Sequence, residues 1–377
     1  MNTALDRIRE ALGGAPGVAF GAPGRANLIG EHTDYNGGLV LPVALEMRTF
    51  VGGSYTEERV LRLQSLDEPG AVVVDLDSGR GPAAGWGRYA TGVVRAALDE
   101  GYELRGFAGV VASDVPIGAG LSSSAALEVA IAWAVLQSGP GVLEVARLCR
   151  RAENVYCGTQ SGIMDQLTAT AGVADHALLI DCLDETFDPV PVPPGLIVLV
   201  IDSGVHRTLA DSGYNRRRAE CERAARILGI DTLREARLED IEAGQLRDPE
   251  RRRARHVVTE NDRVLRAVGA LRGGDTGALG PLFAESHRSL AEDFEVSTPE
   301  VDLLVGTAAG TPGIVAARMT GGGFGGCIVC LVDAGAEGAA AQRIAAQYEA
   351  TTGRRARHWV SRPADGAGPV NWGRRQK

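Results

Sequence analysis

The sequence has almost no lysine. Its only lysine is Lys377, and the remaining 38 basic residues are arginines. Several enzyme classes need a lysine in a folded site: P-loop proteins place one on the nucleotide phosphates, protein kinases carry one on a strand, and Schiff-base enzymes react through one. The sequence therefore excludes these classes. Any phosphate site in this protein has to be built from other groups.

Cysteine is also sparse, and long apolar runs are missing. The six cysteines are scattered over 377 residues, which indicates reduced thiols and not a disulfide framework. Cys327 and Cys330 form a CxxC pair, but they lie in the apolar run CIVCLV, which predicts a buried strand. No apolar run approaches ~20 residues, so we expect no membrane-spanning helix. The charged stretch MNTALDRIRE is unlike a signal peptide, and we therefore expect a cytoplasmic protein.

Composition and length set the class of protein. The formal net charge is −9, which argues against nucleic acid or an anionic membrane as the main partner. Hydrophobic residues make up 45% of a chain of 377 residues, which is ordinary for a globular protein of two domains. The proline-rich segment PVPVPPG (189–195) is the expected boundary, dividing the chain into lobes 1–190 and 191–377.

Apolar periodicity and glycine-rich turns predict a mixture of helices and strands. In the first half we expect helices over 3–12, 86–100, 121–137 and 142–155, and strands at 18–20, 39–74, 107–115 and 176–182. In the second half we expect strands at 196–204, on both sides of a glycine turn at 320–326, and near 356–360, with helices over 214–228, 257–270, 275–291, 299–309 and 337–350. We interpret the run RRRARH (251–256) as a solvated helix face. This mixture predicts an α+β fold in two lobes.

The segment PIGAGLSSSAALEVA (116–130) places a glycine turn and three serines at the start of an apolar helix. The first N–H groups of a helix are unpaired and carry partial positive charge, and glycines let an anion approach them closely. The segment therefore predicts a phosphate cradle that needs no lysine. Serine capping of a core helix is the alternative, but one serine would be enough for a cap.

Two further segments carry concentrated signals. GRANLIGEHTDYNGG (24–38) brings Arg25, Glu31, His32 and Asp34 together in turn-like sequence, and such groups are suited to binding sugar hydroxyls. A solvated polar loop is the alternative. TGGGFGG (320–326) has five glycines in seven residues, more than a tight hairpin requires. We expect it to complement the first glycine turn and to brace the phosphates or the substrate pocket.

These three segments resemble the three signature motifs of the GHMP small-molecule kinases, and the serine segment resembles the galactokinase members most closely. The motifs occur in the family's order over residues 24–332, and the GIMDQ sequence of galactokinases is present at 162–166. The resemblance implies the two-lobed GHMP fold, with mixed β-sheets flanked by helices and the active site in the cleft between the lobes. It also implies that the last strand returns to the first lobe.

The resemblance further implies ATP-dependent phosphorylation of the 1-hydroxyl of α-D-galactose. Asp165 would be the base or the electrostatic anchor for that hydroxyl, and Arg25 would keep it ionised and stabilise the moving phosphoryl group. The sugar contacts carried over from the family are Glu31, His32, Asp34, Gly162 and Tyr214. The tyrosine lies in the segment HRTLADSGYNRRR (206–218).

Nucleotide and metal positions are implied in the same way. The triphosphate would lie on the 118–124 turn, contacted by Gly118, Gly120, Ser122, Ser123 and Ser124. Ser124 and Glu153 would hold Mg²⁺. Trp86 resembles the aromatic residue near the adenine, although ordinary core packing explains it equally well.

Two other functions remain open at this stage. One is a sister sugar 1-kinase acting on N-acetylgalactosamine or arabinose, and the other is a non-catalytic sensor of galactose and ATP. The uninterrupted serine motif SSSAA (122–126) favours a working enzyme. The expected ligands are galactose and Mg-ATP, with no nucleic acid or membrane partner, and the sequence names no protein partner.

Overall fold

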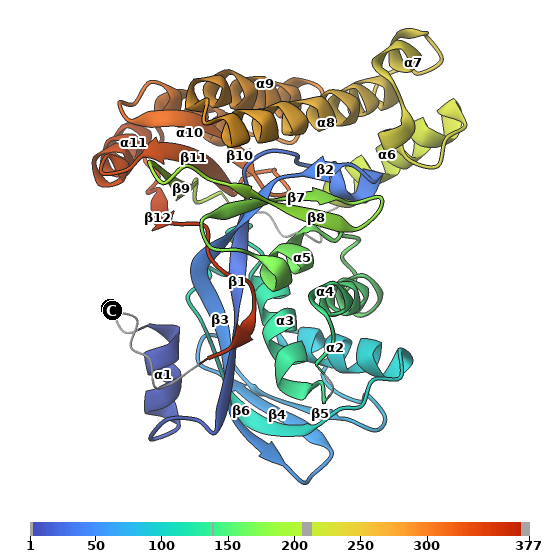
Figure 1. Cartoon of the computed structure of the whole chain (residues 1–377), viewed down its shortest axis with the longest axis vertical. Helices are drawn as coiled ribbons and strands as arrows, with labels where there is room; N and C mark the ends of the chain where they lie inside the picture. Colours follow the sequence, from blue (N-terminus) through green and yellow to red (C-terminus); the bar gives the residue numbers. More distant parts are fainter. Residues whose placement is uncertain (1–2, 138, 206–212, 371–377) are drawn as a thin grey trace.

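The computed structural model describes residues 3–137, 139–205 and 213–370, which form two lobes (Figure 1). The first lobe is built on a six-stranded sheet in the order β13-β1-β3-β6-β4-β5. Its strands are β1 (Val18–Asn27), β3 (Pro42–Thr56), β4 (Val60–Ser65), β5 (Ala71–Asp75), β6 (Gly106–Ser113) and β13 (Gly368–Pro369). All neighbouring strands in this sheet are antiparallel except β4 and β6.

Helices cover both faces of this sheet. On one face lies α1 (Ala4–Ala11), whose Ile8 packs with Val110 and Ala112 of β6. On the other face lie α2 (Gly87–Asp99), α3 (Ser123–Val135), α4 (Val142–Arg151) and α5 (Met164–Ala171) (Figure 1). A small sheet of β2 (Leu39–Val40), β7 (His176–Asp181) and β8 (Thr186–Pro191) adjoins them. α3 is apolar on most of its surface because it is buried at the centre of the lobe.

The second lobe has a four-stranded antiparallel sheet in the order β10-β11-β9-β12. Its strands are β9 (Leu196–Asp202), β10 (Ile314–Thr320), β11 (Cys327–Asp333) and β12 (Arg357–Ser361). Its helices are α6 (Gly213–Leu228), α7 (Leu238–Glu242), α8 (Glu250–Gly273), α9 (Leu279–Glu292), α10 (Pro299–Ala309) and α11 (Glu337–Thr352). After β12 the chain returns to the first lobe, where β13 pairs with β1.

Most of the predicted elements are present, with differences at their ends. β1 continues to Asn27, so Arg25 lies on a strand and not in a loop. The helix predicted over 142–155 ends at Arg151 and continues as the π-helical turn Ala152–Cys157. The helix predicted over 257–270 is the longer α8. Cys327 and Cys330 are free and buried in β11, which confirms the buried strand. Over the described ranges, no helix is long and apolar enough to cross a membrane.

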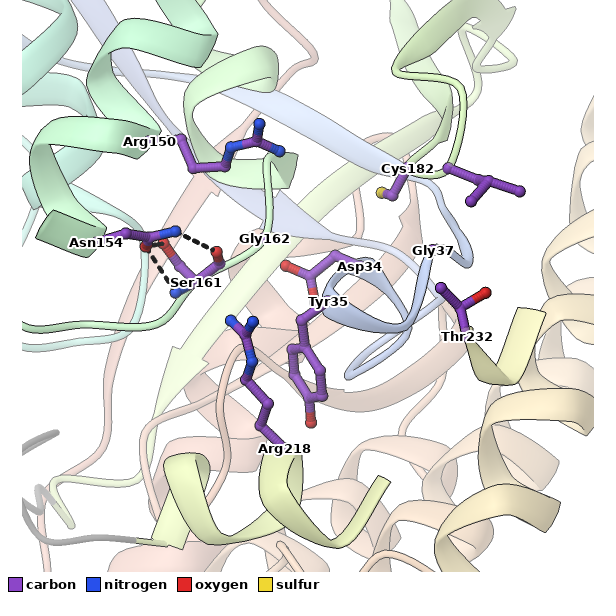
Figure 2. A pocket seen from close by; sticks show the side chains of 11 residues that line it. Asp34, Tyr35, Gly37, Arg150, Asn154, Ser161, Gly162, Cys182, Arg218 and Thr232 are labelled. Carbon is purple, nitrogen blue, oxygen red and sulfur yellow. Dashed lines mark hydrogen bonds between the residues drawn. The ribbon is translucent and has the colours of Figure 1, made fainter. Parts of the chain in front are cut away.

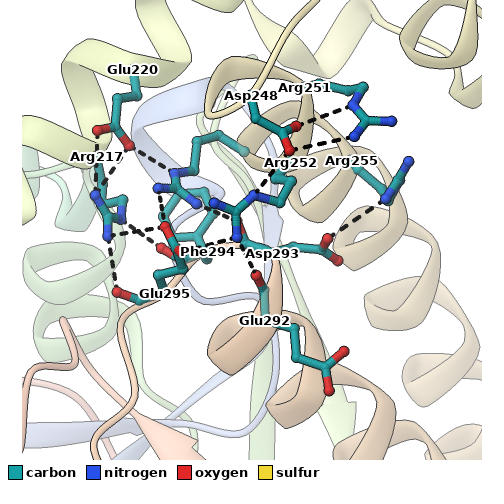
Figure 3. A network of polar contacts seen from close by, with 11 residues as sticks. Arg217, Glu220, Asp248, Arg251, Arg252, Arg255, Glu292, Asp293, Phe294 and Glu295 are labelled. Carbon is teal, nitrogen blue, oxygen red and sulfur yellow. Dashed lines mark hydrogen bonds and ion pairs between the residues drawn. The ribbon is translucent and has the colours of Figure 1, made fainter.

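The interpretation of RRRARH (251–256) as a solvated face is wrong for Arg253 and His256, whereas Arg251, Arg252 and Arg255 are partly exposed. Arg253 is 2% exposed and His256 is fully buried. The Arg253 guanidinium donates to Glu220 at 2.7 Å and to Glu295 at 2.6 Å. Figure 3 labels these two carboxylates within the surrounding polar network. A buried arginine is stable only when it is paired in this way, and its partners come from distant parts of the chain. Local sequence does not reveal them.

Candidate active site

A buried arginine and an aspartate meet between β1 and α5. Arg25 donates from Nε to Asp165 Oδ1 at 2.7 Å and from Nη2 to Oδ2 at 2.9 Å, while its Nη1 donates to the Gly120 carbonyl at 2.7 Å. The Arg25 side chain is 7% exposed and that of Asp165 is 22% exposed. The pairing of β1 with β3 shifts between Pro23 and Arg25, and such an irregularity re-aims a side chain. The result is a bidentate ion pair open to solvent on the Asp165 side.

The glycine turn before α3 faces the same pair. Gly118 and Gly120 both have a φ of 77° and are exposed, and Ser122 has a φ of 58°. The Ser122 hydroxyl donates to Asp165 Oδ2 and makes no cap bond to α3. The capping alternative is therefore not what the structure shows for Ser122. Ser123 and Ser124 lie in the first turn of α3. The N–H groups of a first helical turn have no partner within the helix, and a phosphate fits as their acceptor.

Ser124 leads to a second carboxylate. Its hydroxyl donates to Glu153 Oε1 at 3.1 Å, and Glu153 Oε2 accepts from Ser161 and Gln166, each at 2.8 Å. Burial and the nearby Asp165 raise the pKa of Glu153. In the part of the chain that the structure describes, no group of three His, Cys, Asp or Glu side chains could hold a metal. A hydroxyl and one carboxylate fit Mg²⁺, which usually binds few protein ligands and completes its shell with phosphate and water.

Asp34 begins the short 3₁₀ turn Asp34–Asn36 and packs against Gly162. A Cβ atom on Gly162 would lie 2.3 Å from Asp34 Oδ2, so only glycine permits this contact. Burial and the negative charge of Asp165 raise the pKa of Asp34 to about 6. The structure thus brings Asp34, Gly162 and Asp165 together from two segments that are far apart in sequence.

Aromatic rings surround His32. Its ring lies 5.4 Å from Tyr214 and 4.7 Å from Phe294, and Nδ1 is hydrogen-bonded to the Tyr35 hydroxyl at 2.8 Å. Burial lowers the pKa of His32 to about 3, so the imidazole is neutral. A backbone hydrogen bond with Gly322 partly offsets this effect of burial. Burial also raises the pKa of Tyr214 well above 10. Residues 206–212 of the tyrosine segment lie outside the described residues.

Glu31 is bonded within the protein. Its carboxylate accepts from Arg318 Nη1 and Asn27 Nδ2, each at 2.6 Å, from the Gly321 N–H at 2.7 Å, and from the Thr320 hydroxyl at 3.1 Å. These bonds join the 24–38 segment to β10 and to the start of the second glycine turn. A sugar contact at Glu31 stays a prediction, and it would have to be made in addition to these four.

The two glycine-rich turns lie against one another. A Cβ atom on Gly321 would be 3.2 Å from the Gly120 carbonyl, and Cys327 Sγ lies 3.0 Å from the Ala119 carbonyl. Phe324, between glycines of this turn, has a φ of 60°. The 320–326 turn therefore packs against the glycine turn before α3 and supports it.

Trp86 precedes α2 and packs partly buried against the core of the first lobe. Its Nε1 donates to the Pro69 carbonyl at 3.2 Å. These contacts fit the packing alternative, and a role near the adenine stays a prediction.

A polar cavity of about 380 Å³ opens beside Asp34 and Gly162. Arg150 of α4 and Arg218 of α6 border it from two sides (Figure 2). The cavity therefore lies where the two lobes meet, next to the residues predicted to bind sugar.

Sequence reasoning missed the residues that support this site from the second lobe. They are Arg318 on β10 and His256, Glu260 and Asn261 on α8, all buried. A signal was available, because polar residues four apart in a helix, such as His256 and Glu260, share one face. Their partners, however, could not be named before the fold was known.

Family models match three parts of the chain. Residues 9–55 match the "Galactokinase galactose-binding signature", residues 88–173 the "GHMP kinases N terminal domain", and residues 267–350 the "GHMP kinases C terminal". These ranges contain the three glycine-rich or polar segments described above.

Whole-chain comparisons agree. A galactokinase of Roseiflexus sp. (strain RS-1) is 45% identical over 375 residues, with 97% of this chain and 96% of the relative covered. The galactokinase of Homo sapiens is also 45% identical, with 96% and 94% covered. The crystal structure of Lactococcus lactis galactokinase complexed with galactose matches with a TM-score of 0.91 at 33% identity, covering 97% of this chain and 98% of the other. A mevalonate kinase at 17% identity and a TM-score of 0.64 shares the fold. The chain belongs to the galactokinase family of the GHMP kinases.

Proposed function

We propose that the protein transfers the γ-phosphate of ATP to the 1-hydroxyl of α-D-galactose, giving galactose 1-phosphate and ADP. One observation carries the proposal: the ion pair of Arg25 and Asp165 lies where the glycine turn before α3 meets the turn that carries Asp34. The first turn suits a triphosphate and the second suits a sugar. The related Lactococcus lactis enzyme was solved with galactose bound, which supports the choice of sugar.

Asp165 is the group that meets the acceptor hydroxyl. A carboxylate has about four lone-pair sites, and three of those of Asp165 accept bonds from Arg25 Nε, Arg25 Nη2 and Ser122. About one site is left, on Oδ1, and the sugar hydroxyl would donate to it. The three fixed donors hold the carboxylate in one orientation, so the hydroxyl oxygen is aimed before phosphoryl transfer begins.

Arg25 serves both reactants. Two of its nitrogens hold Asp165, and its third is fixed on the Gly120 carbonyl of the phosphate turn. Phosphoryl transfer has a loose transition state, so charge and position supply most of the catalysis. Gly118, Gly120, Ser122, Ser123 and Ser124 would bind the phosphates through the turn and the helix start.

Ser124 and Glu153 would hold the magnesium ion, because their oxygens already lie 3.1 Å apart beside the start of α3. When bound, Mg²⁺ neutralises charge on the β- and γ-phosphates. Ser161 and Gln166 hydrogen-bond to Glu153, so its carboxylate is oriented before magnesium binds.

Asp34, His32, Gly162 and Tyr214 would bind the sugar. His32 is buried and neutral beside Tyr214, and a neutral imidazole can hydrogen-bond a sugar hydroxyl. Asp34 offers a carboxylate to sugar hydroxyls, and Gly162 leaves it the room to do so. We place the reaction in the cytoplasm, where ATP is available and where the free cysteines stay reduced.

A coupled assay tests the proposal. ATP turnover is measured with Mg²⁺ across galactose, glucose, N-acetylgalactosamine and arabinose, and the product is identified by ³¹P NMR. We expect turnover of about 1–100 s⁻¹ on galactose, a 1-phosphate product, and little reaction with glucose. A much higher kcat/KM on N-acetylgalactosamine would change the substrate, and galactose binding without turnover on any sugar would contradict the proposal.

A further inference from the structure

One face of α8 holds the backbone of the loop that carries Glu31, His32 and Asp34. His256 Nε2 is bonded to the Glu31 carbonyl at 3.0 Å. Glu260 Oε1 accepts from the Gly30 N–H at 3.0 Å. Since a carbonyl can only accept, the Nε2 of His256 must be the donor in the first of these bonds.

A third residue of α8, next to Glu260 in the sequence, holds the far end of the loop. Asn261 Oδ1 accepts from the Leu39 N–H at 2.8 Å. The helix and loop are also in close contact, because a Cβ atom on Gly30 would lie 3.0 Å from Val264 Cγ2. Three side chains from one helix of the second lobe therefore hydrogen-bond to the loop backbone at both of its ends.

The loop needs this support because its backbone is not held by a strand ladder. β1 ends at Asn27, and β2 begins only at Leu39. Between them, Gly30 has a φ of 105° and His32 a φ of 62°. For a residue with a Cβ atom, such a backbone persists only where its surroundings enforce it. The His256 bond to the Glu31 carbonyl lies directly before the left-handed His32.

The side chains of Glu260 and His256 are themselves held in place by other residues. Burial opposes the charge of Glu260, but Arg263 and Arg318 outweigh it, and they lower its pKa to about 2. The Ser286 hydroxyl donates to the same carboxylate at 2.6 Å. His256 is fully buried, and its Nδ1 is bonded to Ser289 at 2.9 Å. Neither side chain is free to swing away from the loop.

The start of α8 is anchored as well. Arg253, one turn before His256, pairs with Glu220 of α6 and with Glu295, which follows α9. It also bonds the Asp293 carbonyl. The network fixes the register of α8 against α6 and α9, and therefore the height at which His256 and Glu260 meet the loop.

We propose that His256, Glu260 and Asn261 are positioning residues that hold the 30–39 loop in its sugar-binding conformation. The inference rests on the proposed function. They touch no reacting atom and act through the backbone next to His32 and Asp34. Within the described part of the chain, these three side chains bond to the backbone of the loop and not to the phosphate turn before α3, so their effect should fall on the sugar and not on ATP.

The central test compares His256→Leu with His256→Gln. Leucine removes the donor and leaves the Glu31 carbonyl buried and unpaired, so we expect the KM for galactose to rise about tenfold or more. The KM for ATP should stay within about twofold, and kcat should change less than the galactose KM. Glutamine carries an N–H at a similar reach, and it should restore the galactose KM to within about threefold of the wild type.

Val257→Ala is the matched control, because Val257 is buried on the same helix within the core of the second lobe and its side chain makes no hydrogen bond. It should lower Tm while leaving both KM values unchanged. A purely structural role for His256 predicts the same pattern for His256→Leu. Equal galactose KM values in active His256→Leu and wild-type enzyme would overturn the inference.

Hydrogen exchange separates this inference from the proposed function. In the absence of ligand, amides of residues 28–41 should exchange at least tenfold faster in His256→Leu than in Val257→Ala. Equal exchange rates in the two variants would refute the inference that α8 holds the loop in its conformation. A wild-type protein with no turnover on galactose refutes the proposed function and the sugar role of these residues, whatever exchange shows.

Discussion

The substitution Asp34→Asn should stabilise the sugar-free protein at neutral pH and weaken its binding of galactose. Burial and the charge of Asp165 raise the pKa of Asp34 from 3.8 to about 6. The folded protein therefore binds this proton more tightly than the unfolded chain does. The stability that the protonated carboxyl provides is complete below pH ~4 and is lost as the pH rises through ~6. Asparagine is neutral at every pH, so the variant keeps this contribution to stability as the pH rises.

The magnitude follows from the two pKa values. A difference of about 2 corresponds to about 3 kcal/mol between the charged and neutral forms. Asp34 is partly exposed, so water screens part of this penalty, and we expect an advantage of about 1–3 kcal/mol for the asparagine variant above pH ~7. For a chain of this size, that is a rise in Tm of roughly 1–5 °C.

Thermal unfolding from pH 4.5 to 8 measures this difference in the absence of sugar. The gap in Tm between Asp34→Asn and wild type should widen as the pH rises to ~6 and should then stay constant. Asp188→Asn removes an exposed carboxylate that pairs with Arg272, and it controls for the loss of one negative charge from the surface. A gap that is independent of pH, or a variant less stable than wild type at pH 7.5, would refute the reasoning.

Three further changes test other parts of the site. Asp165→Asn should lower kcat by about 10²–10⁴ while galactose still binds in calorimetry, and a loss below tenfold would remove Asp165 from the mechanism. Gly162→Ala should raise the KM for galactose at least tenfold, because its Cβ would lie 2.3 Å from Asp34 Oδ2; an unchanged KM would show that Asp34 does not need its present position. Glu153→Gln should raise the Mg²⁺ concentration needed for half-maximal rate several-fold, and a magnesium titration that overlays the wild type would move the metal elsewhere.

Much of the site could be predicted from the sequence because its parts are local. Glycine turns and a helix start are encoded by neighbouring residues, and the segments at 24–38, 116–130 and 320–326 were visible for that reason. The three segments occur in the same order as the motifs of the GHMP kinases, and this resemblance supplied the predicted roles of the site residues. The structure adds what local sequence does not contain, such as the bond from Ser122 to Asp165 and the packing of Gly321 on Gly120.

The polar face of α8 shows why the remainder was not predicted. A charged run in a helix usually faces solvent, and RRRARH was interpreted on that basis. Arg253 and His256 are buried because their partners, Glu220 and the Glu31 carbonyl, come from segments 33 and 225 residues away. Similarly, the four bonds on Glu31 depend on β10 lying beside the end of β1. No periodicity in the sequence reports contacts of this kind.

The return of the chain to β13 has a consequence for biosynthesis. Gly368 and Pro369 close the edge of the first-lobe sheet on Gly21 and Phe20, and Gly366 bonds back to Gly172. While the polypeptide is still emerging from the ribosome, the first lobe has all its other strands but an open β1 edge. An unpaired edge is a template for joining to another chain. A nascent or truncated protein that stops before residue 368 should therefore aggregate more readily than the full chain, even though its catalytic side chains are all present.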